Sequence, residues 1–330
     1  AYVLQWLDFN GFIIALIVGY YLRLAIIMVY SLWLYRPHIH FEWPENSKQL
    51  WTYILLIFLS AFGASVIIDI DAGMLGKMVD EKYVAYYKVA IFIAAIIEAP
   101  GRALLQIVSP LVAEALNQKN DKELASLLKK SGTNLLLVSG LFFVLINANI
   151  DDLYAFIYYL NGKEGFALAI PVVLIISLTK LFSASMGCLN NIITNSKYFY
   201  VVPIFSIGSA VAVVFLNIHF IEELGFIGAA VATLIVISVF NLLKLLFIAR
   251  TIKISPYGKE TLYLLGIIAG TYILFFNISL PFSAFVNLGL KSDAISVVYL
   301  VICYQLNISE TVNQFLETFF KKLRLSLIHI

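Results

Sequence analysis

Apolar residues fill the chain in long windows that short polar stretches separate. A helix needs roughly 20 apolar residues to cross about 30 Å of hydrocarbon, because each residue adds about 1.5 Å. A membrane β-barrel would instead show short alternating segments of about ten residues. The pattern predicts an all-α, polytopic transmembrane helical bundle with nine spans. The predicted spans are residues 11–34, 52–73, 83–112, 130–149, 167–193, 198–217, 224–249, 260–277 and 292–308.

The composition agrees with a membrane protein. Apolar residues make up 62% of the chain and charged residues 13%, whereas soluble domains carry about 25% charge. The net charge of +2 and the lack of a basic run give no sign of nucleic-acid binding. Cys188 and Cys303 fall within predicted helices, where free thiols behave as small hydrophobes. With no phosphate-binding glycine loop, nucleophile elbow or metal cluster in the sequence, we expect no enzymatic activity, no metal and no cofactor.

Lysine and arginine gather in alternate inter-span segments, which sets the orientation in the membrane. One set holds Arg36, Lys48, Lys119, Lys122, Lys129, Lys130, Lys197, Arg250, Lys253, Lys259, Lys321, Lys322 and Arg324. The other set holds only Lys77, Lys82, Lys163 and Lys291 and is richer in acids. The first set is therefore predicted to be cytoplasmic, in a multi-pass protein of the bacterial inner (plasma) membrane.

The polar stretches also predict domains. Residues 35–49 resemble a linker between two bundles, so residues 1–49 are predicted to hold the last helix of an N-terminal lobe and a cytoplasmic linker. Residues 50–254 are predicted to form a six-helix C-terminal lobe. Residues 255–330 add two helices and a cytoplasmic tail, which is either a short amphipathic helix or a solvated extension. Because the number of spans is odd, we expect that a longer protein contains further N-terminal helices.

Three segments carry a resemblance to a known family. They are IIDIDAGMLGKMVDEKYVAYYKVA (67–90), PGRALLQIVSPLVAEALNQKN (100–120) and GCLNNIITNSKYF (187–199). With the six-plus-two helix plan, they resemble the C-terminal two thirds of Wzx-type polysaccharide (O-antigen) flippases of the multidrug/oligosaccharidyl-lipid/polysaccharide (MOP) exporter superfamily.

The resemblance implies a MOP/MATE-like fold, in which two six-helix lobes face each other across a central cavity. It implies a flippase that moves undecaprenyl-diphosphate-linked oligosaccharide across the inner membrane by alternating access, for surface polysaccharide or lipopolysaccharide biosynthesis. The implied partners are this lipid-linked oligosaccharide, membrane lipids and the polysaccharide polymerase machinery. The implied oligomeric state is a monomer.

Ionisable side chains within the predicted spans are candidate functional residues, because a charge at the bilayer centre costs at least about 2.5 kcal/mol unless it faces a cavity or a partner. We single out one acid, Glu98, and four cations at such positions. The cationic excess favours a cavity for an anion, and the resemblance implies that this anion is the lipid-linked diphosphate. The predicted substrate-binding residues are Arg23, Lys88, Arg102 and Lys180.

Each of these charges also has a structural interpretation. Glu98 and Arg102 are four residues apart and can pair on one helix face. Lys88 lies near the outer end of its span, so its ammonium can extend to the lipid head groups. Arg23 and Lys180 lie too deep for that and either face a cavity or pair across the lobes.

Asp69 and Asp71 close the second predicted span. They are two residues apart and cannot share a helix face, so we expect one of them to contact solvent. They form either an acidic cap at the interface or, with Glu98, the ion-coupling residues of a proton- or sodium-driven transporter. Pro100 and Gly101 interrupt the third span, and such a break is either a packing kink or a transporter hinge.

Three alternative functions share parts of this pattern. A multidrug or lipid-precursor exporter of the same superfamily would have the same architecture, although acids rather than cations would suit cationic drugs. An integral-membrane polysaccharide polymerase or ligase usually presents a sizeable outer loop with catalytic polar residues, and the predicted outer loops here are short. A purely structural membrane subunit would have its buried charges paired within the bundle.

Overall fold

The apolar windows fold into helices. The computed structural model describes residues 8–35, 43–162, 165–314 and 317, and over these residues it contains helices and no strand. Eight helical segments of the described chain are long and apolar enough to cross a membrane. The chain is therefore a multi-pass membrane protein, and the predicted all-α helical bundle is confirmed.

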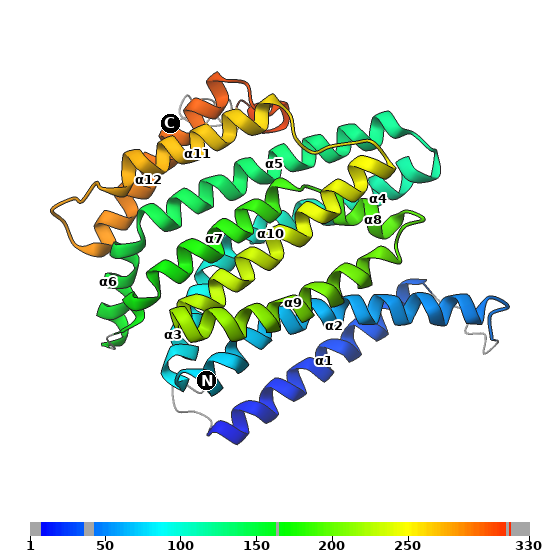
Figure 1. Cartoon of the computed structure of the whole chain (residues 1–330), viewed down its shortest axis with the longest axis horizontal. Helices are drawn as coiled ribbons and strands as arrows, with labels where there is room; N and C mark the ends of the chain where they lie inside the picture. The colour runs from blue at the N-terminus through cyan, green and yellow to red at the C-terminus, as the bar shows by residue number, and fades with distance from the viewer. Residues whose placement is uncertain (1–7, 36–42, 163–164, 315–316, 318–330) are drawn as a thin grey trace. The chain divides into compact units, whose positions relative to one another are not determined.

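The helices follow one another with short connections (Figure 1). Two segments, η1 and η2, are short 3₁₀ helices. The elements are α1 (Phe9–Tyr35), α2 (Ser47–Met78), α3 (Glu81–Ala95), η1 (Ile96–Glu98), α4 (Ala99–Asn117), α5 (Asp121–Ala148), α6 (Ile150–Asn161), η2 (Phe166–Ala169), α7 (Ile170–Ser185), α8 (Leu189–Asn195), α9 (Val201–Leu224), α10 (Phe226–Thr251), α11 (Lys259–Phe276) and α12 (Ala284–Gln305).

Eight of the nine predicted spans correspond to the eight apolar segments. The remaining one, residues 52–73, lies in α2, where the apolar stretch formed by described side chains covers only Leu50–Gly63. That span stays a prediction. The predicted tail helix also lies largely outside the described residues, which are helical from Glu310 to Gln314.

The chain divides into two compact units, Ala1–Thr52 and Tyr53–Ile330. In the first unit, α1 is apolar on all sides and every side chain from Ile13 to Tyr35 is exposed. Part of the predicted linker, residues 36–42, lies outside the described residues. The predicted domain limits at residues 49 and 254 stay predictions.

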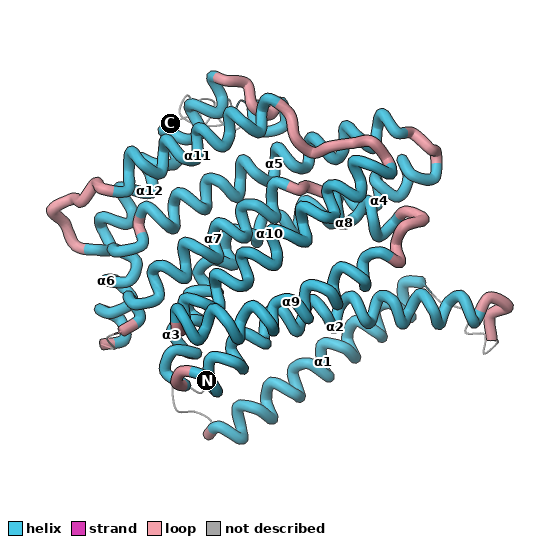
Figure 2. The backbone as a smooth tube through the Cα atoms, in the orientation of Figure 1, coloured by secondary structure: helices cyan, strands magenta, loops and turns pink. Residues whose placement is uncertain are grey.

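Helix α5 forms the centre of the second unit. It packs against α4, α7, α11 and α12, while α7 also packs against α3 and α10, and α10 packs against α9. Figure 1 and the tube view of Figure 2 accordingly show α11, α5, α7, α10 and α9 side by side. A buried apolar core fills the space between α3, α5, α7 and α12, and a smaller one lies between α4, α8, the N-terminal part of α5 and the C-terminal part of α10.

Capping residues fix where two of the helices begin. The Asp80 carboxylate accepts the backbone N–H of Lys82 at 2.9 Å at the start of α3. The Asn120 side chain accepts the N–H of Glu123 at 3.1 Å at the start of α5, and Asp121 and Glu123 complement the helix dipole there.

Several predicted helix limits were wrong, and three of them concern the candidate site residues or the turn after α7. Helix α2 continues to Met78, so neither Asp69 nor Asp71 caps its end. Helix α12 begins at Ala284, so Lys291 lies inside a helix rather than in a loop. The predicted span 167–193 ends as a helix at Ser185, and a turn and α8 follow.

The turn after α7 depends on Gly187. Its φ of 58° lies in the left-handed region, and a Cβ there would lie 2.5 Å from the backbone nitrogen of Gly132 on α5. The Ser131 hydroxyl accepts the N–H of Cys188 at 3.0 Å and fixes the turn against α5. Glycine is therefore required for both the conformation and the close approach.

We predict that Gly187→Ala lowers the stability of the protein by roughly 2 kcal/mol, because the left-handed conformation alone costs about 1–2 kcal/mol for an L-residue. The measurement is the thermal unfolding midpoint in detergent. Gly266→Ala on α11 is the matched control, since a Cβ there meets no atom within 4 Å. Equal midpoints for the two variants would contradict the role assigned to Gly187.

Candidate functional site

A buried carboxylate joins four helices of the second unit. Asp71 on α2 is 2% exposed. Its Oδ2 accepts the hydroxyls of Tyr87 on α3 and Thr233 on α10, each at 2.7 Å. Its Oδ1 accepts the amide Nδ2 of Asn217 on α9 at 2.6 Å. We call Asp71, Tyr87, Asn217 and Thr233 the Asp71 cluster.

Burial of a carboxylate is unfavourable unless hydrogen bonds or opposite charges replace its hydration. Tyr87 and Asn217 are fully buried and Thr233 is 7% exposed, so water does not supply these contacts. All three donors are neutral, and no cationic side chain of the described residues forms an ion pair with Asp71. The cluster therefore satisfies the carboxylate oxygens without neutralising the charge.

An uncompensated buried carboxylate is suited to bind a cation. A proton neutralises it directly, and a sodium ion needs several oxygen ligands. The second amide atom of Asn217, Oδ1, is buried without a partner in the described structure. Rotation of this amide by half a turn would present Oδ1 to the carboxylate side, and the hydroxyl oxygens of Tyr87 and Thr233 also accept. The cluster thus offers the oxygen ligands that a hard cation prefers.

A second polar feature lies where the third predicted span is interrupted. The Lys180 ammonium on α7 donates to the Glu98 carboxylate at 2.6 Å. The side chains are 26% and 45% exposed, so the pair is accessible from one side. Glu98 therefore pairs with Lys180 on another helix and not with Arg102, four residues along its own segment.

The break beside this pair is stabilised from α5. Pro100 stands in the first turn of α4, directly after the 3₁₀ segment η1, and it provides no N–H for the preceding turn. The hydroxyl of Ser139 donates to the carbonyl of Ile97 at 3.0 Å. A side chain of a neighbouring helix thus satisfies a backbone carbonyl at the interruption.

The structure brings together only some of the predicted site residues. Among them, Glu98 and Lys180 form the one ion pair found within the part of the chain that the structure describes. Lys88 on α3 and Arg102 on α4 are exposed. Arg23 is exposed on α1 in the first unit. Asp69 is exposed while Asp71 is buried, as expected for two carboxylates that point to different sides of a helix.

Five residues with polar roles were missing from the predicted set. Tyr87, Asn217 and Thr233 contact Asp71 across 16, 146 and 162 residues of sequence, so only the fold identifies them. Lys291 is 5% exposed and donates to the carbonyl of Ala148, at the end of α5, at 2.6 Å. Lys244 lies half-buried within the apolar helix α10. Its position within a predicted span could have identified it as a candidate residue.

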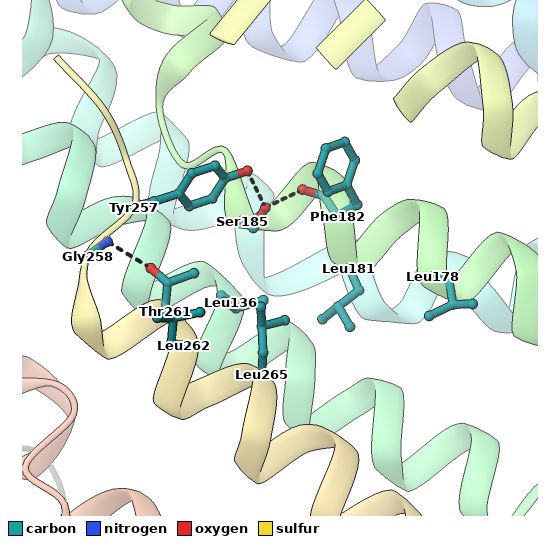
Figure 3. Close-up of a pocket in the computed structure, with 10 residues that line it drawn as sticks. All are labelled: Leu136, Leu178, Leu181, Phe182, Ser185, Tyr257, Gly258, Thr261, Leu262 and Leu265. Carbon is teal, nitrogen blue, oxygen red and sulfur yellow. Dashed lines mark hydrogen bonds between the residues drawn. The ribbon is translucent and has the colours of Figure 1, made fainter. Parts of the chain in front are cut away.

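An apolar cavity of 670 Å³ opens between α5, α7 and α11. Figure 3 shows leucine side chains along its length and a polar end formed by Ser185, Tyr257, Gly258 and Thr261. The hydroxyls of Ser185 and Tyr257 are 3.2 Å apart, and the Gly258 N–H donates to the Thr261 hydroxyl at 3.2 Å. The lining residues are Leu136, Leu178, Leu181, Phe182, Ser185, Tyr257, Gly258, Thr261, Leu262 and Leu265.

The Tyr257 hydroxyl at the polar end of this cavity stays neutral. Burial raises the pKa of Tyr257 above its ordinary value of 10.0, and the hydrogen bond with Ser185 opposes that shift. Tyr257 therefore remains a hydroxyl at physiological pH. A chain of carbon atoms with a small polar end fits such a lining better than a charged ligand does.

No protein-family model, curated protein or solved structure matches the chain. The resemblance to polysaccharide flippases therefore stays a prediction. Among the described residues, no group of three or more His, Cys, Asp or Glu side chains is arranged to hold a metal ion.

A double-mutant cycle tests the Glu98–Lys180 pair. We expect Glu98→Gln and Lys180→Met to show a coupling free energy of about 1 kcal/mol, because the ion pair is partly buried. The measurement is the free energy of unfolding of the single and double variants in detergent. The matched cycle uses Glu98→Gln with Arg102→Met and is expected to show no coupling. Coupling with Arg102 instead of Lys180 would show that the pair is assigned to the wrong residue.

Proposed function

We propose that this chain is part of an ion-coupled flippase, which moves an undecaprenyl-diphosphate-linked oligosaccharide from the cytoplasmic to the outer leaflet of the bacterial inner membrane by alternating access. The flippase carries out no covalent chemistry. The observation that carries the transporter class is the Asp71 cluster, and the resemblance of residues 67–90, 100–120 and 187–199 supplies the substrate.

The Asp71 cluster supports ion coupling because it places an unneutralised carboxylate between four helices. Binding of a proton or sodium ion removes the negative charge and changes which partners the oxygens of Tyr87 and Thr233 contact. A change in these contacts alters how α2, α3, α9 and α10 pack. A ligand can shift a conformational equilibrium only by binding the two states with different affinity, and a site formed jointly by several helices meets that requirement.

The Glu98–Lys180 pair supports anion recognition. A diphosphate carries more negative charge than one carboxylate and offers several acceptor oxygens, so it competes with Glu98 for the Lys180 ammonium. The pair lies beside the η1 interruption, where a helix changes direction most easily. In the proposed cycle, Lys180 exchanges Glu98 for the substrate diphosphate, and the exposed Lys88 and Arg102 add cationic charge in the same unit.

The apolar cavity supports a lipid-linked substrate. Its leucine lining suits an isoprenoid chain, and several lining side chains, including Leu178 and Leu265, are exposed at its mouth. The same cavity also favours a second candidate function, the export of a compact apolar drug or lipid precursor. These two candidates differ in whether the ligand carries a diphosphate.

We predict that Asp71→Asn abolishes transport while leaving the protein folded. Asparagine keeps the size of the side chain and removes the charge that binds the coupling ion. The measurement uses the gene that encodes this chain in a strain without its own flippase, and it scores surface polysaccharide. We expect a loss of about tenfold or more, because coupling ions act through the whole transport cycle. Asp69→Asn, which alters an exposed carboxylate two residues away, is the matched control and is expected to retain transport.

Membrane levels and unfolding midpoints of both variants separate loss of transport from loss of folding. Normal polysaccharide with Asp71→Asn would contradict ion coupling at this residue. A parent protein that restores no polysaccharide but lowers the uptake of amphipathic drugs would favour the exporter.

A further inference from the structure

A second large cavity lies at the end of the second unit where most lysines and arginines gather. Its volume is 640 Å³. It lies between three connections, those that join α4 to α5, α8 to α9 and α10 to α11. The lining residues are Leu116, Asn117, Lys119, Asp121, Leu124, Asn195, Ser196, Lys197, Tyr198, Thr251, Ile252 and Lys253.

Each of the three connections contributes one lysine to this cavity. Lys119, Lys197 and Lys253 face a single acid, Asp121, among the lining residues. None of the three lysines forms an ion pair with any described residue. The Lys197 ammonium lies 5.1 Å from the ring centroid of Tyr198. The lining thus carries an excess of positive charge with no carboxylate bound to it. We call it the three-lysine cavity.

Two of these lysines occupy backbone positions that lysine rarely takes. Lys119 has a φ of 52° and Lys253 a φ of 62°, both in the left-handed region. Each follows the end of a helix, and their N–H groups donate to the carbonyls of Leu116 and Ile248, both at 3.1 Å. Glycine or asparagine is usual at such a helix end. A lysine there costs about 1 kcal/mol or more, and such cost is often associated with a functional role.

The floor of the cavity is apolar. Leu124 is 1% exposed and belongs, together with partly buried Leu116 and Ile252, to the smaller hydrophobic core. The Tyr198 ring packs edge-on against Phe247 with ring centroids 5.4 Å apart, which holds this wall in place. Asn117 and Thr251 add polar side chains to the lining. The cavity therefore combines three ammonium groups with a hydrophobic base.

We infer that the three-lysine cavity binds a phosphate ester. The ammonium groups of Lys119, Lys197 and Lys253 hold the phosphate oxygens, and the organic part of the ligand lies on Leu116, Leu124 and Ile252. A bare phosphate is far smaller than the cavity, whereas ligand sites of about 300–1,000 Å³ enclose organic molecules. Such an ester comes either from an anionic phospholipid of the surrounding leaflet or from the aqueous phase. This site is separate from the Asp71 cluster and does not rest on the proposed transport function.

The test compares two triple variants of the purified full chain in a neutral detergent. The first is Lys119→Asn, Lys197→Gln and Lys253→Asn, in which asparagine preserves the left-handed backbone positions. The second is Lys122→Gln, Lys130→Gln and Lys259→Gln, which removes the same charge from the same end of the bundle but outside the cavity. One titration adds phosphatidylglycerol and a parallel titration adds inorganic diphosphate. The measurement is the thermal unfolding midpoint, which is monitored by circular dichroism.

We expect a saturable rise in the midpoint for the parent and for the Lys122/Lys130/Lys259 variant. The apparent Kd of the cavity variant is expected to rise about tenfold or more, because it loses three charge-assisted contacts. A response to phosphatidylglycerol alone identifies a lipid head group, and a response to diphosphate indicates a phosphate ligand that comes from the aqueous phase. No saturable response of the parent to either probe would overturn the inference. An equal loss in both triple variants would also overturn it, because general surface charge would then explain the binding.

If the triple cavity variant does not fold, the single variant Lys197→Gln replaces it in the titrations. Lys197 has no left-handed backbone conformation in the described structure, so its replacement leaves the helix ends unchanged. We expect its apparent Kd to rise about threefold, since one of three charge-assisted contacts is removed. An unchanged Kd would count against the cavity as the binding site.

Discussion

A buried polar group needs a hydrogen-bond partner, and where that partner lies on a neighbouring element the bond specifies which helices meet. Asp71 draws together α2, α3, α9 and α10 through three donors. The same rule operates elsewhere in the second unit, where the Tyr299 hydroxyl donates to the carbonyl of Leu137 at 2.9 Å and Lys291 donates to that of Ala148. Apolar packing alone would leave the choice of neighbours less specific, because lipid chains are as apolar as leucine.

The two polar sites of the proposed transporter share one helical segment. Tyr87 of the Asp71 cluster lies on α3, and Glu98 lies in η1 at the end of that helix. They are separated by 11 residues, or roughly 16 Å at the helical rise. In the proposed cycle, loss of the Asp71 charge frees Tyr87 and lets α3 move relative to α9 and α10. The interruption at η1 and Pro100 lets α3 change direction there. The movement of α3 therefore reaches Glu98 and alters its contact with Lys180.

The sequence was sufficient to predict the membrane-crossing helices, but not the short helix α6 (Ile150–Asn161) or the contacts between helices. Long apolar windows predicted eight of the membrane-crossing helices, because hydrophobic length is a local property. The end of α7 at Ser185 was missed, since nothing local indicates that Gly187 adopts a positive φ against the backbone of Gly132. Lys291 was placed in a loop because the apolar window begins after it, although its ammonium reaches the end of α5.

For the candidate site, too, single residues were predictable from the sequence and their partners were not. Asp71 was a candidate because of its place near the end of an apolar run, but its partners lie on helices far away in the sequence. Glu98 and Lys180 were both recognised as charges within spans. Their pairing joins η1 to α7 and depends on how α3 and α7 pack. Spacing along one helix suggested a Glu98–Arg102 pair that the structure does not form, and spacing gives no information on ion pairs between helices.

The central claim is that Asp71 exchanges a coupling ion, and infrared difference spectroscopy of the purified protein in lipid nanodiscs tests it most directly. The carboxyl band of Asp71 is assigned by its disappearance in Asp71→Asn. The account predicts that this band changes as the pH or the sodium concentration is varied, because the carboxylate takes up or releases a cation. A band that stays the same under both changes would contradict the claim and leave Asp71 as a structural contact between four helices.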